Sequence, residues 1–195
     1  TGASSGIGRA LAYGFARRGA RVVLVARNQE RLDAVRREIE PYTSDVLVIP
    51  ADVTDNAQLE HVVNHTFETF GRIDVLVNNA GLATGGLLQE QSIDRVQRMI
   101  EVNLLGTIRL TQMVLPHMLE QNYGYIMNVA SIAGRSAPPA LTTYSATKYA
   151  LAGFTDALRR EIGGANVRLT LVLPAWTHTD LLSSEIEDLL ERYNF

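Results

Sequence analysis

The feature that most constrains this 195-residue chain is a strict alternation of short apolar runs with longer amphipathic stretches. The short runs have the length of β-strands and are apolar at consecutive positions, as expected for strands that are covered on both faces. They are residues 21–26, 46–50, 74–77, 125–129 and 167–173. Strands that alternate with helices become parallel neighbours joined by right-handed crossovers. The pattern therefore predicts an α/β fold with a doubly wound parallel sheet in a three-layer α/β/α arrangement.

Capping residues mark where the intervening helices begin and end. Asn28, Asp55 and Ser92 each precede a helical pattern, and their short polar side chains suit the N-cap position. Gly71 follows the end of the pattern that Asp55 begins. The pattern that starts after Ser92 is long, and we expect it to break near Asn103.

Composition narrows the class of protein. The sequence has no cysteine, a formal net charge of -3 and 46% hydrophobic residues. A chain without cysteine forms no disulfides and no thiolate metal sites, and it suits the reducing cytoplasm. The small negative charge argues against a nucleic-acid partner, and no apolar run reaches the length of a membrane span. We therefore expect residues 1–195 to form one cytoplasmic globular domain.

Residues 1–8 read TGASSGIG and lead directly into a helical pattern. Gly2, Gly6 and Gly8 let the backbone turn tightly and approach a ligand, while the following helix offers unpaired N–H groups to a pyrophosphate. A glycine loop alone can be a simple turn. Here, however, Asp52 and residues 78–81 follow later strands, at the sheet edge where such folds bind ligands. The sequence therefore predicts a dinucleotide site in a Rossmann-type domain.

The segment YSATK places a phenol at Tyr144 and an ammonium group at Lys148. Four residues apart, the two side chains share one face of the helix expected over residues 142–162. A nearby cation lowers the pKa of a phenol and makes it a usable proton donor to a carbonyl oxygen. Ser131 follows the fourth strand, where its hydroxyl can hydrogen-bond a developing oxyanion. Because its surroundings lack the sharp turn and histidine of a serine hydrolase, we interpret Ser131 as a polar stabiliser.

These motifs occur together in the order typical of short-chain dehydrogenases/reductases, and the chain resembles that family over residues 1–179. The resemblance is carried by TGASSGIG, by NNAG at residues 78–81, by the contexts of Asn103 and Ser131, and by YSATK. It implies that Tyr144 is the acid/base and that Lys148 lowers its pKa and holds the nicotinamide ribose. It also implies that Ser131 orients the substrate carbonyl and that Asn103 joins the proton relay by anchoring a water near Lys148.

The resemblance further implies a set of cofactor contacts, in which Asp52 and Val53 meet the adenine and the NNAG segment lines the cofactor. The family's proline-glycine-x-valine-x-threonine stretch is present as PAWTHT at residues 174–179, so Ala175 and Thr177 replace glycine and valine. With Arg27 added for the reason below, the expected cofactor-binding residues are Gly2, Ser4, Ser5, Gly6, Ile7, Gly8, Arg27, Asp52, Val53, Asn79, Ala80, Gly81, Tyr144, Lys148, Pro174, Thr177 and Thr179.

Arg27 indicates which nicotinamide cofactor the chain prefers. NAD-specific folds place a carboxylate at the end of the second strand, where it binds the ribose hydroxyls. Here residues 21–26 correspond to that second strand, and Arg27 follows it where an acidic residue would stand. A guanidinium can pair bidentately with the 2′-phosphate of NADP(H), although it can also lie in solvent and stack on adenine. We predict that NADP(H) is favoured over NAD(H).

Other residues carry weaker signals. His61 and His65 lie four apart on a helix, but they lack a zinc-protease glutamate and a third ligand, so we expect no metal site. His178 is a candidate substrate contact. Residues 181–195 are amphipathic and form either a lid over the substrate, as in the family, or an ordinary surface or interface helix.

Two functions fit these observations. The first is an oxidoreductase that interconverts a carbonyl and an alcohol by hydride transfer; the second is a catalytically silent nucleotide-binding regulatory or scaffold protein of the same fold. The first is favoured because the four expected catalytic residues are all present: Asn103, Ser131, Tyr144 and Lys148. The sequence does not identify the substrate, because the substrate pocket is built mainly by loops such as residues 82–91 and by the C-terminal segment. By analogy with the family we expect a homodimer or homotetramer.

A glycine loop of this kind follows a strand, yet nothing precedes Thr1 in the sequence. In the strand order 3-2-1-4-5-6 that strand is central and lies between residues 21–26 and residues 74–77. We therefore expect the natural chain to carry a strand before Thr1 and to continue past Phe195 with a helix and an edge strand. The structure should then show an open slot between the two runs instead of direct pairing.

Overall fold

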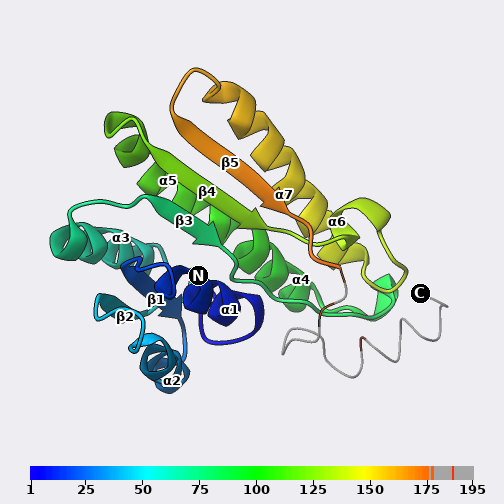
Figure 1. Ribbon diagram of the computed structural model, residues 1–195. Helices are drawn as coiled ribbons and strands as arrows, with labels where there is room; N and C mark the ends of the chain where they lie inside the picture. Colours follow the sequence, from blue (N-terminus) through cyan, green and yellow to red (C-terminus); the bar gives the residue numbers. More distant parts are fainter. Residues whose placement is uncertain (176, 178–185, 187–195) are drawn as a thin grey trace.

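The computed structural model describes residues 1–175, 177 and 186, and its helices and strands alternate along the chain (Figure 1). Every strand pair in it is parallel. All five expected strands are confirmed, with each boundary within one residue of the sequence prediction. They are β1 (Val22–Ala26), β2 (Val46–Pro50), β3 (Val75–Asn78), β4 (Gly124–Val129) and β5 (Val167–Val172).

The helices begin and end where the capping residues indicate. The side chains of Asn28, Asp55 and Ser92 each accept a hydrogen bond from a backbone N–H in the first turn of the helix that follows. Gly71 ends α3 with a φ of 74°, a left-handed conformation that favours glycine. The longer helices are α1 (Gly6–Ala16), α2 (Gln29–Ile39), α3 (Asn56–Phe70), α4 (Ile93–Ile100), α5 (Gly106–Glu120) and α7 (Thr142–Glu161). The short ones are η1 (Leu88–Glu90) and α6 (Ala133–Ser136).

The expected break near Asn103 is a turn of π-helix, η2 (Glu101–Leu105), between α4 and α5. The backbone N–H of Gly106 reaches back to the carbonyl of Glu101 and closes this wider turn. Gly106 also lies against the loop after β2, where a Cβ atom would be 2.8 Å from the Val53 carbonyl oxygen. The π-turn and the close contact between Gly106 and Val53 together position Asn103 relative to the end of the sheet.

The sheet consists of two groups of strands. β1 pairs with β2, and β3, β4 and β5 pair in that order. Among the described residues β1 and β3 do not pair with each other, as the expected strand order requires. Residues near the N-terminus contact both groups: the Thr1 amino group donates to Val77 O (2.8 Å) and Ala3 N donates to Val25 O (3.2 Å). In Figure 1 the N-terminus lies between the two groups.

Each group of strands has its own core. Leu24 and its neighbours in β1 pack against α1 and α2, with Ala16 and Leu32 fully buried. Leu76, Ile126 and Leu169 of the three-stranded group belong to a cluster that includes residues of α3, α5 and α7. Burial of this apolar area is the main stabilising contribution to such a fold.

The other face of the three-stranded group differs from the expectation that strands are covered on both sides. Val75 is 38% exposed and Tyr125 is 37% exposed. The guanidinium of Arg168 lies 5.7 Å from the centre of the Tyr125 ring. Strand residues alternate between faces, so these positions share one face while Leu76 and Ile126 face the core. In the described part of the chain this second face is therefore partly open to solvent.

Candidate active site

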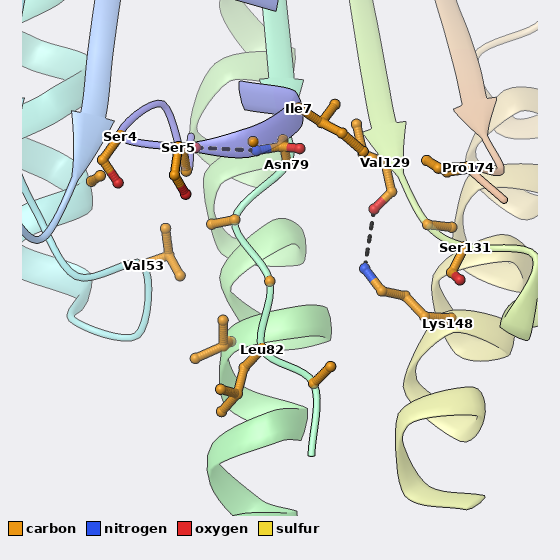
Figure 2. A pocket seen from close by; sticks show the side chains of 18 of the residues that line it. Ser4, Ser5, Ile7, Val53, Asn79, Leu82, Val129, Ser131, Lys148 and Pro174 are labelled. Carbon is orange, nitrogen blue, oxygen red and sulfur yellow. Dashed lines mark hydrogen bonds between the residues drawn. The ribbon is translucent and has the colours of Figure 1, made fainter. Parts of the chain in front are cut away.

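A cavity of about 890 Å³ runs along the edge of the sheet where the strands end, within the size range of pockets for cofactors and small molecules. Its walls come from segments far apart in the sequence, because the carboxyl ends of parallel strands all meet at that edge (Figure 2). Most of the expected site residues line it: Gly2, Ser4, Ser5, Gly6, Ile7, Arg27, Asp52, Val53, Asn79, Ala80, Gly81, Ser131, Tyr144, Lys148, Pro174 and Thr177.

The glycine loop has the backbone geometry of an anion site. Gly2 and Gly6 have φ angles of 64° and 50°, which other residues rarely adopt. Ser5 occupies the N-cap of α1 without a capping hydrogen bond from its side chain, and the first intrahelical bond runs from Arg9 N to Ser5 O (3.1 Å). The N–H groups that precede Arg9 in the helix are therefore available to a pyrophosphate.

Two close contacts hold the glycine loop in place. Asn79, of the NNAG segment, donates from Nδ2 to the carbonyl oxygens of Thr1 (3.0 Å) and Gly2 (3.3 Å). A Cβ atom on Gly8 would lie only 2.1 Å from Gly2 O. Gly8 does not line the cavity, and its expected contact with the cofactor stays a prediction. Its small size lets α1 approach the loop.

Arginine side chains gather at the end of the cavity near β1 and β2, where Arg27 and Arg98 both line the wall. Arg98, on α4, donates to the Asp52 carboxylate (2.5 Å) and to Thr54 Oγ1 (2.7 Å). Burial alone would raise the pKa of Asp52, but hydrogen bonds from Thr54 and Arg98 lower it on balance. Arg98 was not predicted from the sequence, because no local pattern connects it to Asp52.

The expected catalytic side chains meet at the opposite end of the cavity. Ser131 lies just beyond β4, and Lys148 projects from α7 (Figure 2). Tyr144 belongs to the same helix and lines the same cavity. Tyr144 is 6% exposed and Lys148 is 3% exposed. The Lys148 ammonium donates to Val129 O (3.1 Å) and lies 5.7 Å from the centre of the Tyr144 ring. A buried phenol, an ammonium group and a hydroxyl thus converge beside the cavity.

The sequence pattern of the short chain dehydrogenases matches residues 1–190. The chain belongs to this family. It is 43% identical over 166 residues to human dehydrogenase/reductase SDR family member 7, which covers 83% of the chain and 49% of the relative. It is 39% identical over 181 residues to the Thermotoga maritima 3-oxoacyl-[acyl-carrier-protein] reductase FabG, covering 93% of the chain and 74% of the relative.

Solved structures agree with this assignment. A short-chain dehydrogenase/reductase from Burkholderia phymatum, solved in complex with NAD, superposes with a TM-score of 0.90 at 31% identity. The match covers 96% of this chain and 67% of the other. The present chain spans about half the length of the human relative.

Burial dominates the protonation of Tyr144 and Lys148 in this short-chain dehydrogenase. It raises the pKa of Tyr144, and a hydrogen bond with Ser131 lowers that pKa only in part. It also lowers the pKa of Lys148 to about 8. The shift at Tyr144 is opposite to the one expected from YSATK, because the phenol is buried and its lowering partner is Ser131 instead of Lys148. Tyr144 is therefore a neutral phenol near neutral pH.

Asn103 is buried and does not line the cavity. Its Oδ1 accepts from Leu82 N (2.7 Å), while its Nδ2 donates to Leu82 O (2.8 Å) and to Thr147 Oγ1 (3.0 Å). Thr147 Oγ1 in turn donates to Tyr144 O (2.7 Å). Asn103 thus ties the loop after β3 to the helix that bears Tyr144 and Lys148.

A second pair of buried amides joins β3 to β4. Asn78 donates to Asn128 Oδ1 (2.9 Å) and to Thr111 Oγ1 (3.1 Å), and Asn128 donates to Thr155 Oγ1 (2.9 Å). This network connects β3 and β4 to α5 and α7, so Asn78 of the NNAG segment helps to stabilise the sheet. Asn128 was missed by the sequence analysis because a single asparagine in a strand has no distinctive spacing.

The last part of the chain is described in part. Thr179, His178 and most of residues 181–195 lie outside the described residues, so their expected contacts stay predictions. Ile186 is described and is buried in a cluster with Met99, Leu141 and Tyr144. An apolar side chain from this segment therefore packs beside the phenol.

Two negative expectations concern metals and membranes. The rings of His61 and His65 stack 5.5 Å apart, and no group of three potential metal-ligating side chains occurs among the described residues. In the same part of the chain, no helix combines the length and apolar character needed to cross a membrane.

Proposed function

We propose that this chain is an NADP(H)-preferring oxidoreductase that interconverts a carbonyl and an alcohol by hydride transfer. One observation carries the proposal: a single cavity joins the glycine loop and Arg27 at one end to Ser131, Tyr144 and Lys148 at the other. Such an arrangement suits an extended dinucleotide whose reactive ring must lie beside a proton donor.

The residues at the first end suit a dinucleotide phosphate. The N-terminus of α1 offers N–H groups with no side-chain cap, and the backbone around Gly2 and Gly6 adopts conformations that open the loop toward a ligand. The expected contacts that line the cavity would hold the cofactor along its length. When bound, a nicotinamide supplies or accepts the hydride.

The residues at the second end would handle the proton and orient the substrate. Because burial raises its pKa, Tyr144 holds its proton at neutral pH and can give it to a carbonyl oxygen during reduction. Ser131 would hydrogen-bond the same oxygen as negative charge develops on it. Lys148, protonated below its pKa of about 8, would stabilise charge at this end and hold the nicotinamide ribose.

Asn103 is proposed to join the proton relay. Its side chain is already engaged with Leu82 and Thr147, so it would act by holding the loop and α7 in register beside Lys148. As the resemblance implies, Asn103 would also anchor a water near Lys148 in this relay.

The preference for NADP(H) rests on Arg27. This residue lines the cavity directly after β1, where NAD-specific folds place a carboxylate. Asp52, the only carboxylate among the described residues that line the cavity, is paired with Arg98. The similar Burkholderia phymatum protein was solved with NAD, so relatives do not all bind the same cofactor as the one proposed here. The preference of this chain is therefore tested by measuring NADPH and NADH directly.

The decisive experiment follows the oxidation of NADPH by absorbance in the presence of ketones, quinones and acyl thioesters. We expect at least one of these carbonyl compounds to be reduced, with NADPH used more efficiently than NADH. Cofactor binding without turnover across the panel would favour the catalytically silent nucleotide-binding protein instead.

Domain organisation, location and assembly belong to the same proposal. Residues 1–195 would form a single NAD(P)-binding domain with an integral catalytic site, working in the cytoplasm on a small carbonyl or alcohol. The family analogy supports a homodimer or homotetramer, which sedimentation of the purified protein would test.

A further inference from the structure

Two loops flank Tyr144, and both contribute to its surroundings. The loop after β3 includes Leu82 and Ala83, which line the cavity, and Ala83 packs against the apolar cluster around Tyr144 and Leu141. The second loop, residues 137–141, leads directly into α7. The two loops therefore meet at the apolar cluster beside Tyr144, with Ala83 contributed by the first loop and Leu141 by the second.

The side chain of Gln91 connects the two loops. Its Oε1 accepts a hydrogen bond from Thr143 Oγ1 (2.8 Å), and Thr143 is the residue before Tyr144. Its Nε2 donates to Gly86 O (2.8 Å) in the first loop. Gly86 N then donates to Ala140 O (3.0 Å) in the second loop. One amide thus closes a bridge of three hydrogen bonds between the loops.

The backbone that this bridge holds is in conformations that rarely persist unaided. Gly86 has a φ of 131°, and Ala137 and Ala140 have φ angles of 45° and 60° although both carry a Cβ atom. Residues in such regions are kept there by their surroundings, and they cluster at functional sites. The Gly86–Ala140 hydrogen bond joins two of them directly.

Only a side chain that both accepts and donates can make this bridge. A carboxylate at position 91 would still accept from Thr143 but could not donate to Gly86 O. A leucine of similar size would lose both bonds. The chemistry of Gln91 is therefore matched to its two partners.

We propose that Gln91 is a positioning residue that fixes the loop after β3 against the start of α7 and thereby sets which carbonyl substrates fit beside Tyr144. This role rests on the proposed function, since it concerns substrate choice at the same site. Gln91 does not contact the reacting atoms; it acts through Gly86 and Thr143.

The test compares Q91L and Q91E with Q121L as a matched control. Like Gln91, Gln121 makes two side-chain hydrogen bonds and does not line the cavity; it donates from Nε2 to the carbonyl oxygens of Ile73 (2.8 Å) and Tyr123 (2.5 Å). Each full-length variant is assayed with the best ketone of the panel and with a homologue one methylene group longer. Hydrogen exchange of residues 82–91 and the Kd for NADPH are measured alongside.

We expect Q91L to change the ratio of kcat/KM for the two ketones by about tenfold, mainly through KM, and to speed hydrogen exchange at Gly86. Q91E should show a smaller change, and Q121L should keep the ratio of the wild-type protein. The Kd for NADPH should stay the same in all variants. T143V should reproduce part of the Q91L effect, and T143S, which keeps the hydroxyl, should restore the wild-type ratio.

Two results would overturn the role of Gln91 while leaving the proposed function standing. One is an active wild-type enzyme whose ketone ratio is equally affected by Q91L and Q121L. The other is unchanged hydrogen exchange at residues 82–91 in Q91L. A wild-type protein that reduces no carbonyl compound contradicts the proposed function itself, and the selectivity role fails with it.

Discussion

The Lys148 ammonium nitrogen lies 5.7 Å from the centre of the Tyr144 ring and donates its hydrogen bond to Val129 O. The cation therefore faces the end of β4 and the cavity, while the phenol has Ser131 as its hydrogen-bonding neighbour. Under the proposed function the two side chains would have separate tasks: Tyr144 would supply the proton, and Lys148 would supply charge and hold the cofactor.

Tyr144→Phe should separate chemistry from binding. The change removes only the phenolic hydroxyl, so turnover should fall by roughly 100-fold or more while the affinity for NADPH stays nearly the same. Steady-state kinetics and a fluorescence titration of NADPH measure the two quantities. Lys148→Ala should lower both turnover and cofactor affinity. Near-normal turnover by Tyr144→Phe on a good substrate would show that another group is the acid.

Arg27→Ala should weaken NADPH binding much more than NADH binding, because only NADPH carries the 2′-phosphate. Loss of a charge-assisted pair costs on the order of 1.5–3 kcal/mol, which is roughly ten- to a hundredfold in Kd. Titrating both cofactors against both proteins by fluorescence measures the difference. Equal losses for the two cofactors would mean that Arg27 does not read the phosphate.

Gly8→Ala should abolish tight cofactor binding. The added Cβ atom would lie 2.1 Å from Gly2 O and 2.6 Å from Asn79 Nδ2, so the glycine loop must move. Gly14→Ala is the matched control on the same helix, because the nearest atom to its Cβ is the end of the Arg18 side chain at 4.0 Å. That control should keep cofactor affinity and stabilise α1 by up to about 1 kcal/mol. Similar affinities for the two variants would contradict the close packing at Gly8.

Lys148→Met should show how burial of the ammonium affects stability. The folded-state pKa of Lys148 is lowered from 10.5 to about 8, so the unfolded chain binds this proton more tightly and the charge destabilises the fold below about pH 8. The penalty disappears as the pH rises from about 8 to 10.5. At 1.36 kcal/mol per pH unit it is on the order of 3 kcal/mol.

The free energy of unfolding of Lys148→Met, measured with urea, should therefore exceed that of the wild type most clearly below pH 8. The gap should narrow toward pH 10.5, and other titrating groups cancel in the comparison of the two proteins. A gap that is constant across this range would show that Lys148 titrates alike in the folded and unfolded states.

The sequence by itself determined the features that depend on local spacing. Apolar runs of strand length predicted β1 to β5, because strands inside such a sheet are mostly apolar, although one face of β3 and β4 is partly exposed. Asn28, Asp55 and Ser92 predicted helix starts, because an N-cap needs only a side chain and the next turn of backbone. The spacing of Tyr144 and Lys148 predicted that both lie on one face of α7, because residues four apart in a helix are neighbours on its surface.

Only the tertiary structure decided the features that depend on residues far apart in the chain. The pairing of Arg98 with Asp52 and the bridge from Gln91 to Gly86 and Thr143 join separate elements, so no local pattern predicts them. The direction of the pKa shift at Tyr144 depends on how deeply the fold buries the phenol, which outweighs the hydrogen bond with Ser131. Spacing along a helix shows which side chains are neighbours, but their solvation and long-range partners are set by packing.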